Sequence, residues 1–158
     1  MREAAGDSLT VTTKYGTLVG AEEDGLFAIQ GDKMFRVPNI RLVELRRKLG
    51  VPAFSYVFDW KCAVPALGAC HALDVGFVFG STFKEFHGSG EAVGRLAGQM
   101  QDAWIAFAKT GDPSTAGLAW PAYGSERKTM VLGEWCSVEE APYEAERAAW
   151  DGLDSFLG

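Results

Sequence analysis

The chain has 158 residues, a length that suits one domain of ordinary size and leaves little room for two. Apolar residues make up 47% of it, enough for a hydrophobic core, so the composition excludes disorder over most of the length. The net charge of −6 comes without a stripe of Lys and Arg, which argues against a nucleic-acid partner because phosphate neutralisation supplies much of that affinity.

Membrane and redox signals are weak. No uninterrupted apolar run approaches the roughly 20 residues that span a bilayer, and the N-terminal sequence lacks the apolar segment of a signal peptide. We therefore expect a soluble cytoplasmic protein with no membrane partner. The cysteines, Cys62, Cys70 and Cys136, are odd in number and lack CxxC spacing, so we expect unpaired thiols and no disulfide framework.

The first third of the chain predicts short strands and then a helix. Residues 9–29 alternate around a turn at Tyr15-Gly16, and EEDG separates this hairpin from the apolar run LFAIQ. A helix is expected next, because Pro38 can open its first turn, apolar residues follow at helical spacing, and Gly50 can end it. A buried strand is predicted for VPAFSYVFDW, and the loop KCAVPALGACHA follows it.

The clearest predicted helix covers residues 91–109 and is followed by a second strand. Its apolar residues recur at three- and four-residue steps and therefore share one face; they are Val93, Leu96, Met100, Trp104 and Phe107. Beyond it we expect an irregular connector at LAWPAYG, a short strand at TMVLGEW and a closing helix from Pro142. The order predicts a mixed α/β chain with an N-terminal β-hairpin region at 1–31 and a segment at 32–158, together one domain.

A histidine in the loop GACHALDVGFVFG is the first candidate for chemistry. His71 follows the small residues Gly68 and Ala69, so the loop can turn tightly after a strand. An imidazole projecting there can reach a nucleophile and exchange protons near neutral pH, which suits a general base. The residues alone leave open that His71 is an ordinary loop residue.

A serine near the N-terminus matches a short hydrolase motif by chance. The tetrapeptide GDSL contains Ser8 and spells the nucleophile block of a family of small serine hydrolases. The preceding MREAA cannot form the buried strand that this block needs, and no acid stands three residues before either histidine. A hydrolase that uses Ser8 is therefore a rejected alternative.

A metal site is not expected either. Cys62, Cys70, His71 and His87 could be assembled into a set of four ligands, but their spacing matches none of the paired patterns of zinc sites. Nothing else in the sequence suggests a cofactor. We expect no metal and no cofactor.

Several blocks together point to a family. The stretch GACHALDVGFVFG, followed by AGQMQDAWIAFAKTGDPSTAGLAWPAY, closely resembles the C-terminal part of type-B carboxylesterases, the α/β-hydrolase-fold esterases related to cholinesterases and p-nitrobenzyl esterases. The G-A-x-H loop, the FVFG run, the W-x-x-F-A helix end, the T-G-D-P turn and the W-P-x-Y block follow in the family's order. The resemblance covers residues 33 to about 152, and VTTKYGTLVGAEEDGLFAIQG is similar to the family's first strands.

The resemblance implies a partial α/β-hydrolase fold and the hydrolysis of small-molecule carboxylic esters. His71 corresponds to the histidine of the catalytic triad, which activates the serine. Asp74 matches an acidic position that anchors the loop and is not the triad acid. Gly76 stands where the family usually carries proline, and we expect it to loosen the turn without affecting the chemistry.

The serine of such a triad is missing from the sequence. α/β-Hydrolases place it in a G-x-S-x-G elbow before the histidine, and none of the eight serines lies in one. Ser89, in HGSGE, comes nearest, but it lacks the preceding strand and follows His71. Without the serine a triad loses about 10⁴- to 10⁶-fold in rate, so we expect the lone chain to be inactive or very weak. The alternative is a truncated, non-catalytic remnant that self-associates or docks onto a complementing hydrolase fragment through open sheet edges.

Overall fold

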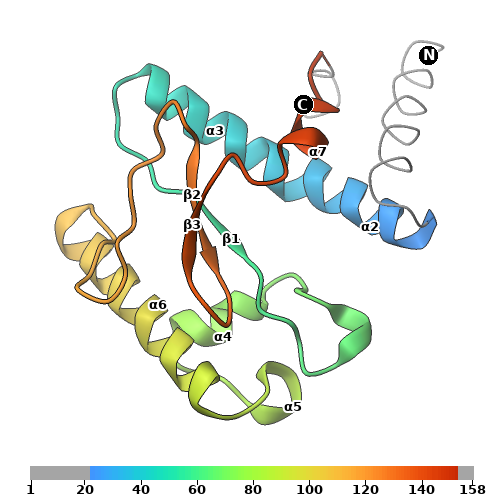
Figure 1. The fold of residues 1–158 in the computed structure, drawn as a ribbon, viewed down its shortest axis with the longest axis vertical. Helices are drawn as coiled ribbons and strands as arrows, with labels where there is room; N and C mark the ends of the chain where they lie inside the picture. Colours follow the sequence, from blue (N-terminus) through green and yellow to red (C-terminus); the bar gives the residue numbers. More distant parts are fainter. Residues whose placement is uncertain (1–21, 153–158) are drawn as a thin grey trace. The chain divides into compact units, whose positions relative to one another are not determined.

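The computed structural model describes residues 22–152, and these divide into two compact units. One unit combines residues 22–51 with 142–152, and the other comprises residues 52–141 (Figure 1). The strands predicted before residue 22 lie outside the described residues. The division of the chain that we predicted at residue 31 stays a prediction.

The first unit is built on a continuous run of helix. It begins with α2 (Glu22–Gly31), passes through one π-helical turn at Asp32–Arg36 and continues as α3 (Val37–Lys48). Pro38 lies in the first turn of α3 and has no N–H to donate. This explains why the backbone hydrogen bonds just before it span five residues, as in a π-helix, and not four. The helix expected from Pro38 to Gly50 is confirmed, and Gly50 has a positive φ of 69° beyond its end.

The strand expected at LFAIQ is wrong, because these residues belong to α2. An apolar run of five residues does not distinguish a strand from a helical segment by its periodicity. Here the run continues without interruption into the π-helical turn and α3, so the helix already present downstream decides its conformation.

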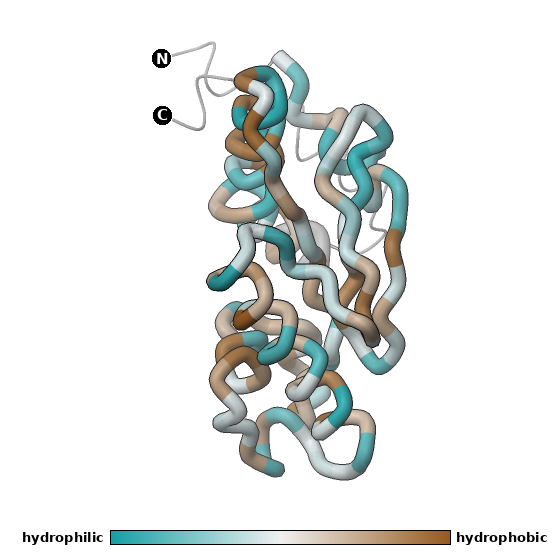
Figure 2. The backbone as a smooth tube through the Cα atoms, turned by 90° about the vertical axis from the view of Figure 1, so that its left-hand side faces the viewer, coloured by the Kyte–Doolittle hydropathy of each residue, from teal (hydrophilic) through white to brown (hydrophobic). Residues whose placement is uncertain are grey.

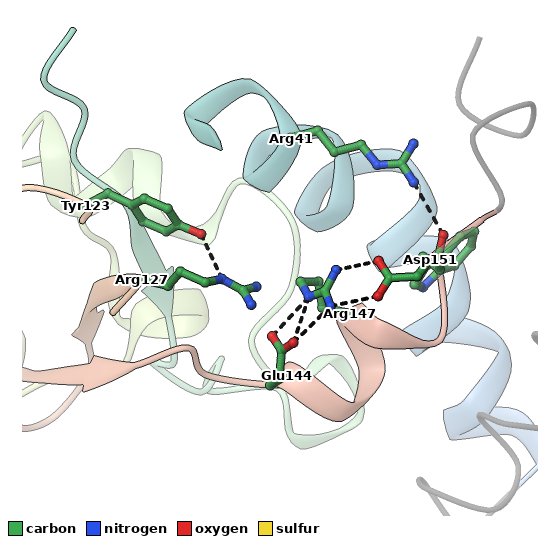
Figure 3. A network of polar contacts seen from close by, with 7 residues as sticks. Arg41, Tyr123, Arg127, Glu144, Arg147 and Asp151 are labelled. Carbon is green, nitrogen blue, oxygen red and sulfur yellow. Dashed lines mark hydrogen bonds and ion pairs between the residues drawn. The ribbon is translucent and has the colours of Figure 1, made fainter. Parts of the chain in front are cut away.

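Charged side chains hold the C-terminal part of this unit. The short helix α7 (Glu144–Ala148) places the Arg147 guanidinium between the carboxylates of Glu144, at 2.9 Å, and Asp151, at 2.7 Å (Figure 3). Arg41 on α3 donates a hydrogen bond to the carbonyl oxygen of Trp150 at 3.4 Å. Buried apolar residues of the unit come from both stretches of the chain: Val37, Ala149 and Trp150.

The second unit contains a sheet of three strands in the order β1-β2-β3. Strand β1 (Tyr56–Phe58) pairs in parallel with β2 (Lys128–Leu132), and β2 pairs antiparallel with β3 (Ser137–Glu140). The strands expected in VPAFSYVFDW and TMVLGEW are therefore confirmed, whereas β3 was not predicted. The parallel register sets Tyr56 opposite Met130 and Phe58 opposite Leu132, so these four side chains share one face.

Three α-helices lie between β1 and β2 along the chain. They are α4 (Leu73–Val78), α5 (Lys84–His87) and the 20-residue α6 (Glu91–Thr110). The predicted helix 91–109 is confirmed, and Gly111 ends it in the left-handed conformation with φ 79°. Of the expected apolar stripe, Val93, Leu96 and Met100 are buried, while Trp104 is half-buried and Phe107 is about half exposed.

The core of this unit forms where α4, α6 and the sheet meet. At its edge the ring of Tyr56, which is 38% exposed, packs edge to face 5.4 Å from Trp104 and 6.0 Å from Trp120 between centroids. The buried members are Phe77, Val93, Leu96, Ala97, Met100, Ala103, Leu118, Trp120, Met130 and Leu132. This core fixes α4, the helix that follows the candidate histidine.

Hydropathy along the backbone changes over short intervals (Figure 2). Within residues 22–152, no helix combines the length and the apolar character needed to cross a bilayer.

Candidate active site

His71 lies in a turn between a short 3₁₀ helix (Pro65–Leu67) and α4, and its side chain is exposed. Two residues with positive φ shape this turn. Gly68, with φ 54° and ψ −140°, takes a conformation open essentially to glycine. Ala72 has φ 65° directly after the histidine, a left-handed conformation that costs an alanine about 1–2 kcal/mol. The expectation that small residues allow a tight turn here is confirmed.

Helix α4 is anchored firmly directly after the turn. Leu73 and Phe77 are fully buried. The Phe77 ring packs against Phe58, with centroids 5.6 Å apart, and against Trp60 at 5.3 Å. These contacts fix the backbone on the C-terminal side of His71.

Asp74 joins the same helix to the sheet. Its carboxylate accepts a hydrogen bond of 2.8 Å from the phenol of Tyr56 on β1. Burial, followed by this hydrogen bond and the carboxylate charge, raises the pKa of Tyr56 well above its ordinary value. Tyr56 therefore remains neutral and continues to donate to Asp74, which is the geometry of a structural anchor.

The loop before His71 is fixed by backbone hydrogen bonds. The N–H of Cys62 donates to the carbonyl of Gly68 at 2.8 Å, which brings the two ends of the loop together. The N–H of Ala63 donates to the carbonyl of Phe86 at 2.9 Å, and the indole N–H of Trp60 donates to the carbonyl of His87 at 2.9 Å. Helix α5, which was not predicted, thus supports this loop.

The other histidine has a structural place. His87 is only 3% exposed and lies edge-on to the rings of Phe77, Phe83 and Phe86. The backbone N–H of Phe83 donates to its Nδ1 at 3.2 Å. Its Nε2 faces Gly76 so closely that a Cβ on Gly76 would lie 2.2 Å from that nitrogen.

Our expectation for Gly76 is therefore wrong. This residue is buried inside α4, so it does not loosen a turn. Its missing side chain instead leaves the space that the imidazole of His87 occupies. A glycine inside an apolar run indicates a close approach of another group, and that signal was present in the sequence.

The remaining candidates do not join His71. Ser8 lies outside the described residues. Ser89 is exposed in the turn that precedes α6. Among residues 22–152, no group of three or more His, Cys, Asp or Glu side chains is placed to hold a metal ion.

The comparisons with known proteins identify the family. The family model described as "Carboxylesterase family" matches residues 8–150. The chain belongs to the carboxylesterase family. The type-B carboxylesterase resemblance inferred from the sequence is thereby confirmed.

Curated relatives of this carboxylesterase chain are much longer proteins. The para-nitrobenzyl esterase of Bacillus subtilis is 40% identical over 102 residues, which cover 61% of this chain and 21% of that relative. Carboxylesterase 5A of Canis lupus familiaris is 32% identical over 139 residues, 80% of this chain and 24% of that relative. The chain thus spans about a fifth to a quarter of the length of these relatives.

Solved structures agree with the fold. The Geobacillus stearothermophilus carboxylesterase at pH 6.2 superposes with a TM-score of 0.70 at 33% identity, covering 80% of this chain and 28% of that one. An esterase of Clostridium hathewayi gives a TM-score of 0.69 at 26% identity, covering 89% of this chain and 28% of that one. The carboxylesterase chain therefore has a partial α/β-hydrolase fold, as predicted.

Proposed function

We propose that this chain supplies the histidine base of a carboxylic-ester hydrolase, with His71 in that role. The observation that carries the proposal is an exposed imidazole on a turn whose two sides are fixed, by buried α4 on one side and by the hydrogen-bonded loop on the other. Ala72, the residue directly after His71, has a strained backbone with positive φ. Such strain is common where a fold holds a side chain for function.

The chemistry is proton transfer to and from a serine. His71 takes the proton from the serine hydroxyl as that oxygen attacks the ester carbonyl, and then delivers it to the departing alcohol. Because the 158 residues contain no G-x-S-x-G elbow, the proposal takes the serine from outside this sequence. Asp74 is engaged by Tyr56, which suits it to hold the turn in place.

Small carboxylic esters are the proposed substrates. Among the relatives, one is named a para-nitrobenzyl esterase, and the Clostridium hathewayi esterase is described as able to hydrolyse aliphatic aromatic polyesters. Both act on carboxylic esters, so we propose that class for this chain. Which alcohol and acyl groups of the ester are accepted depends on residues outside this sequence.

A chimera tests the role of His71. Residues 33–152 would replace the matched region of the Bacillus subtilis relative, which retains its own segment preceding that region. We expect hydrolysis of p-nitrophenyl butyrate, and a loss of about 10⁴- to 10⁶-fold on His71→Ala. Ser89→Ala in the same chimera is the matched control and should leave the rate unchanged. A folded His71→Ala chimera that keeps a tenth or more of the activity would contradict the proposal.

The accessibility of His71 is tested in the chain itself. Diethyl pyrocarbonate acylates exposed imidazoles, and trypsin separates the two histidines into peptides 62–84 and 85–95. We expect rapid modification of His71 and slow modification of His87, because one is exposed and the other is buried. Modification of His71 as slow as that of buried His87 would mean that the imidazole of His71 is not available to a serine.

A further inference from the structure

Two cysteines stand at the ends of the loop that precedes His71. Cys62 begins the loop, Cys70 ends it next to the histidine, and the hydrogen bond from the N–H of Cys62 to the carbonyl of Gly68 closes it at 2.8 Å. The 3₁₀ helix Pro65–Leu67 forms the bend between them. The fold thus brings together two thiols that the sequence alone does not show to be a pair.

The hydrogen bond that closes the loop places Cys62 beside Gly68, two residues before Cys70. Burial, and after it the neighbouring Cys62 thiol, raises the pKa of Cys70. Cys62 is only 5% exposed, and its sulfur accepts the N–H of Val64 at 3.3 Å. Cys70 is more accessible, so an external reagent meets it first.

We propose that Cys62 and Cys70 form a reversible disulfide within the loop. The oxidant is a small-molecule disulfide such as glutathione disulfide. The Cys70 thiolate attacks it, forms a mixed disulfide and releases one thiol. The Cys62 thiolate then attacks the Cys70 sulfur, which forms the Cys62–Cys70 bond and releases the second thiol. The protein loses two electrons and two protons, and the oxidant gains them.

Burial of Cys62 does not prevent the second step. That attack is intramolecular and needs no access from solvent, because the closed loop holds Cys62 beside Gly68, two residues before Cys70. The third cysteine provides an internal control, since the Cys136 thiol donates to the side-chain oxygen of Gln99 at 3.5 Å. Formation of the bond does not depend on the proposed function. It adds a covalent constraint one residue before His71.

The experiment treats the folded full chain with glutathione disulfide and analyses tryptic peptides without reduction. Both cysteines lie in one peptide, 62–84. We expect this peptide to lose two hydrogens and to resist alkylation, with reversal by dithiothreitol. Cys62→Ser should stop at the mixed disulfide on Cys70, whereas Cys136→Ser should behave as wild type. A wild-type chain that stops at the mixed disulfide, or that crosslinks only between two chains, would overturn the proposal.

A second probe does not require oxidation. Phenylarsine oxide bridges two thiols that lie close together, so one equivalent should bind the reduced wild-type chain and Cys136→Ser. Binding should be lost in Cys62→Ser and equally in Cys70→Ser. Retention by either single variant would show that the arsenical does not bridge these two sulfurs and would also overturn the proposal.

Discussion

A methyl group added at Gly76 should collide with His87. The Cβ of alanine would lie 2.2 Å from Nε2 and 2.6 Å from Cε1, whereas ordinary contacts begin at 3.4 Å. The imidazole would have to retreat by about 1.2 Å, the difference between 3.4 Å and 2.2 Å. The rings of Phe77, Phe83 and Phe86 contact it with centroids 5.3, 4.8 and 5.6 Å away, so its retreat would disturb this packing.

The expected magnitude follows from two opposing effects. Overpacking a buried site costs about 1–3 kcal/mol, and replacing glycine by alanine inside a helix stabilises by about 1 kcal/mol. The difference between these two effects is about 0–2 kcal/mol, so Gly76→Ala should lower the free energy of unfolding by up to about 2 kcal/mol. In a His87→Ala background only the helix effect remains, so the same change should stabilise by about 1 kcal/mol.

A double-mutant cycle checks this sign change. Urea unfolding followed by tryptophan fluorescence would be measured for the wild type, both single variants and the double variant. The coupling free energy should equal the overpacking cost, about 1–3 kcal/mol. If Gly76→Ala had the same effect in both backgrounds, within about 0.5 kcal/mol, the contact between Gly76 and His87 could not be the reason for the glycine.

Two further predictions concern the Tyr56 anchor and the helix glycines. Because burial and Asp74 raise the folded-state pKa of Tyr56, the stability that it contributes is present below the unfolded tyrosine pKa of about 10 and is lost at higher pH. Urea midpoints from about pH 9 to 11 should therefore fall more steeply for the wild type than for Tyr56→Phe, and parallel curves would contradict the assignment. Gly111→Ala should destabilise by about 1 kcal/mol because of its positive φ. Gly98→Ala, in open space within α6, should stabilise by about 1 kcal/mol, and thermal melts of both variants would show whether the signs differ.

The elements that the sequence predicted well carry strong local signals. Helix α6 has an apolar stripe over about four turns and a glycine at its end, and α3 has Pro38 in its first turn. Strand β3 was missed because Ser137–Glu140 is exposed and contains two glutamates. It is a strand because β2 offers it a hydrogen-bonding edge, which is a tertiary cause and leaves little trace in the local sequence.

In the candidate site, too, some features were predicted from the sequence and others were not. His71 and Asp74 were found through blocks of sequence that resemble a family, and the Tyr56–Asp74 hydrogen bond gives a physical reason for the acid. The contacts of His87 with Gly76 and of Cys62 with Cys70 were not found. Each depends on how a loop or helix folds back on itself, and no spacing rule encodes that.

The pairing of β1 with β2 has a consequence for synthesis on the ribosome. Tyr56 and its partner Met130 are separated by 74 residues of chain. At about 5–20 residues per second, β1 waits about 4–15 s for the strand that completes its hydrogen bonds. While the last 20 residues before Met130 are made, α6 is complete, but the sheet that covers Leu96 and Met100 is not. The nascent chain therefore offers chaperones an apolar helix face that the finished fold conceals.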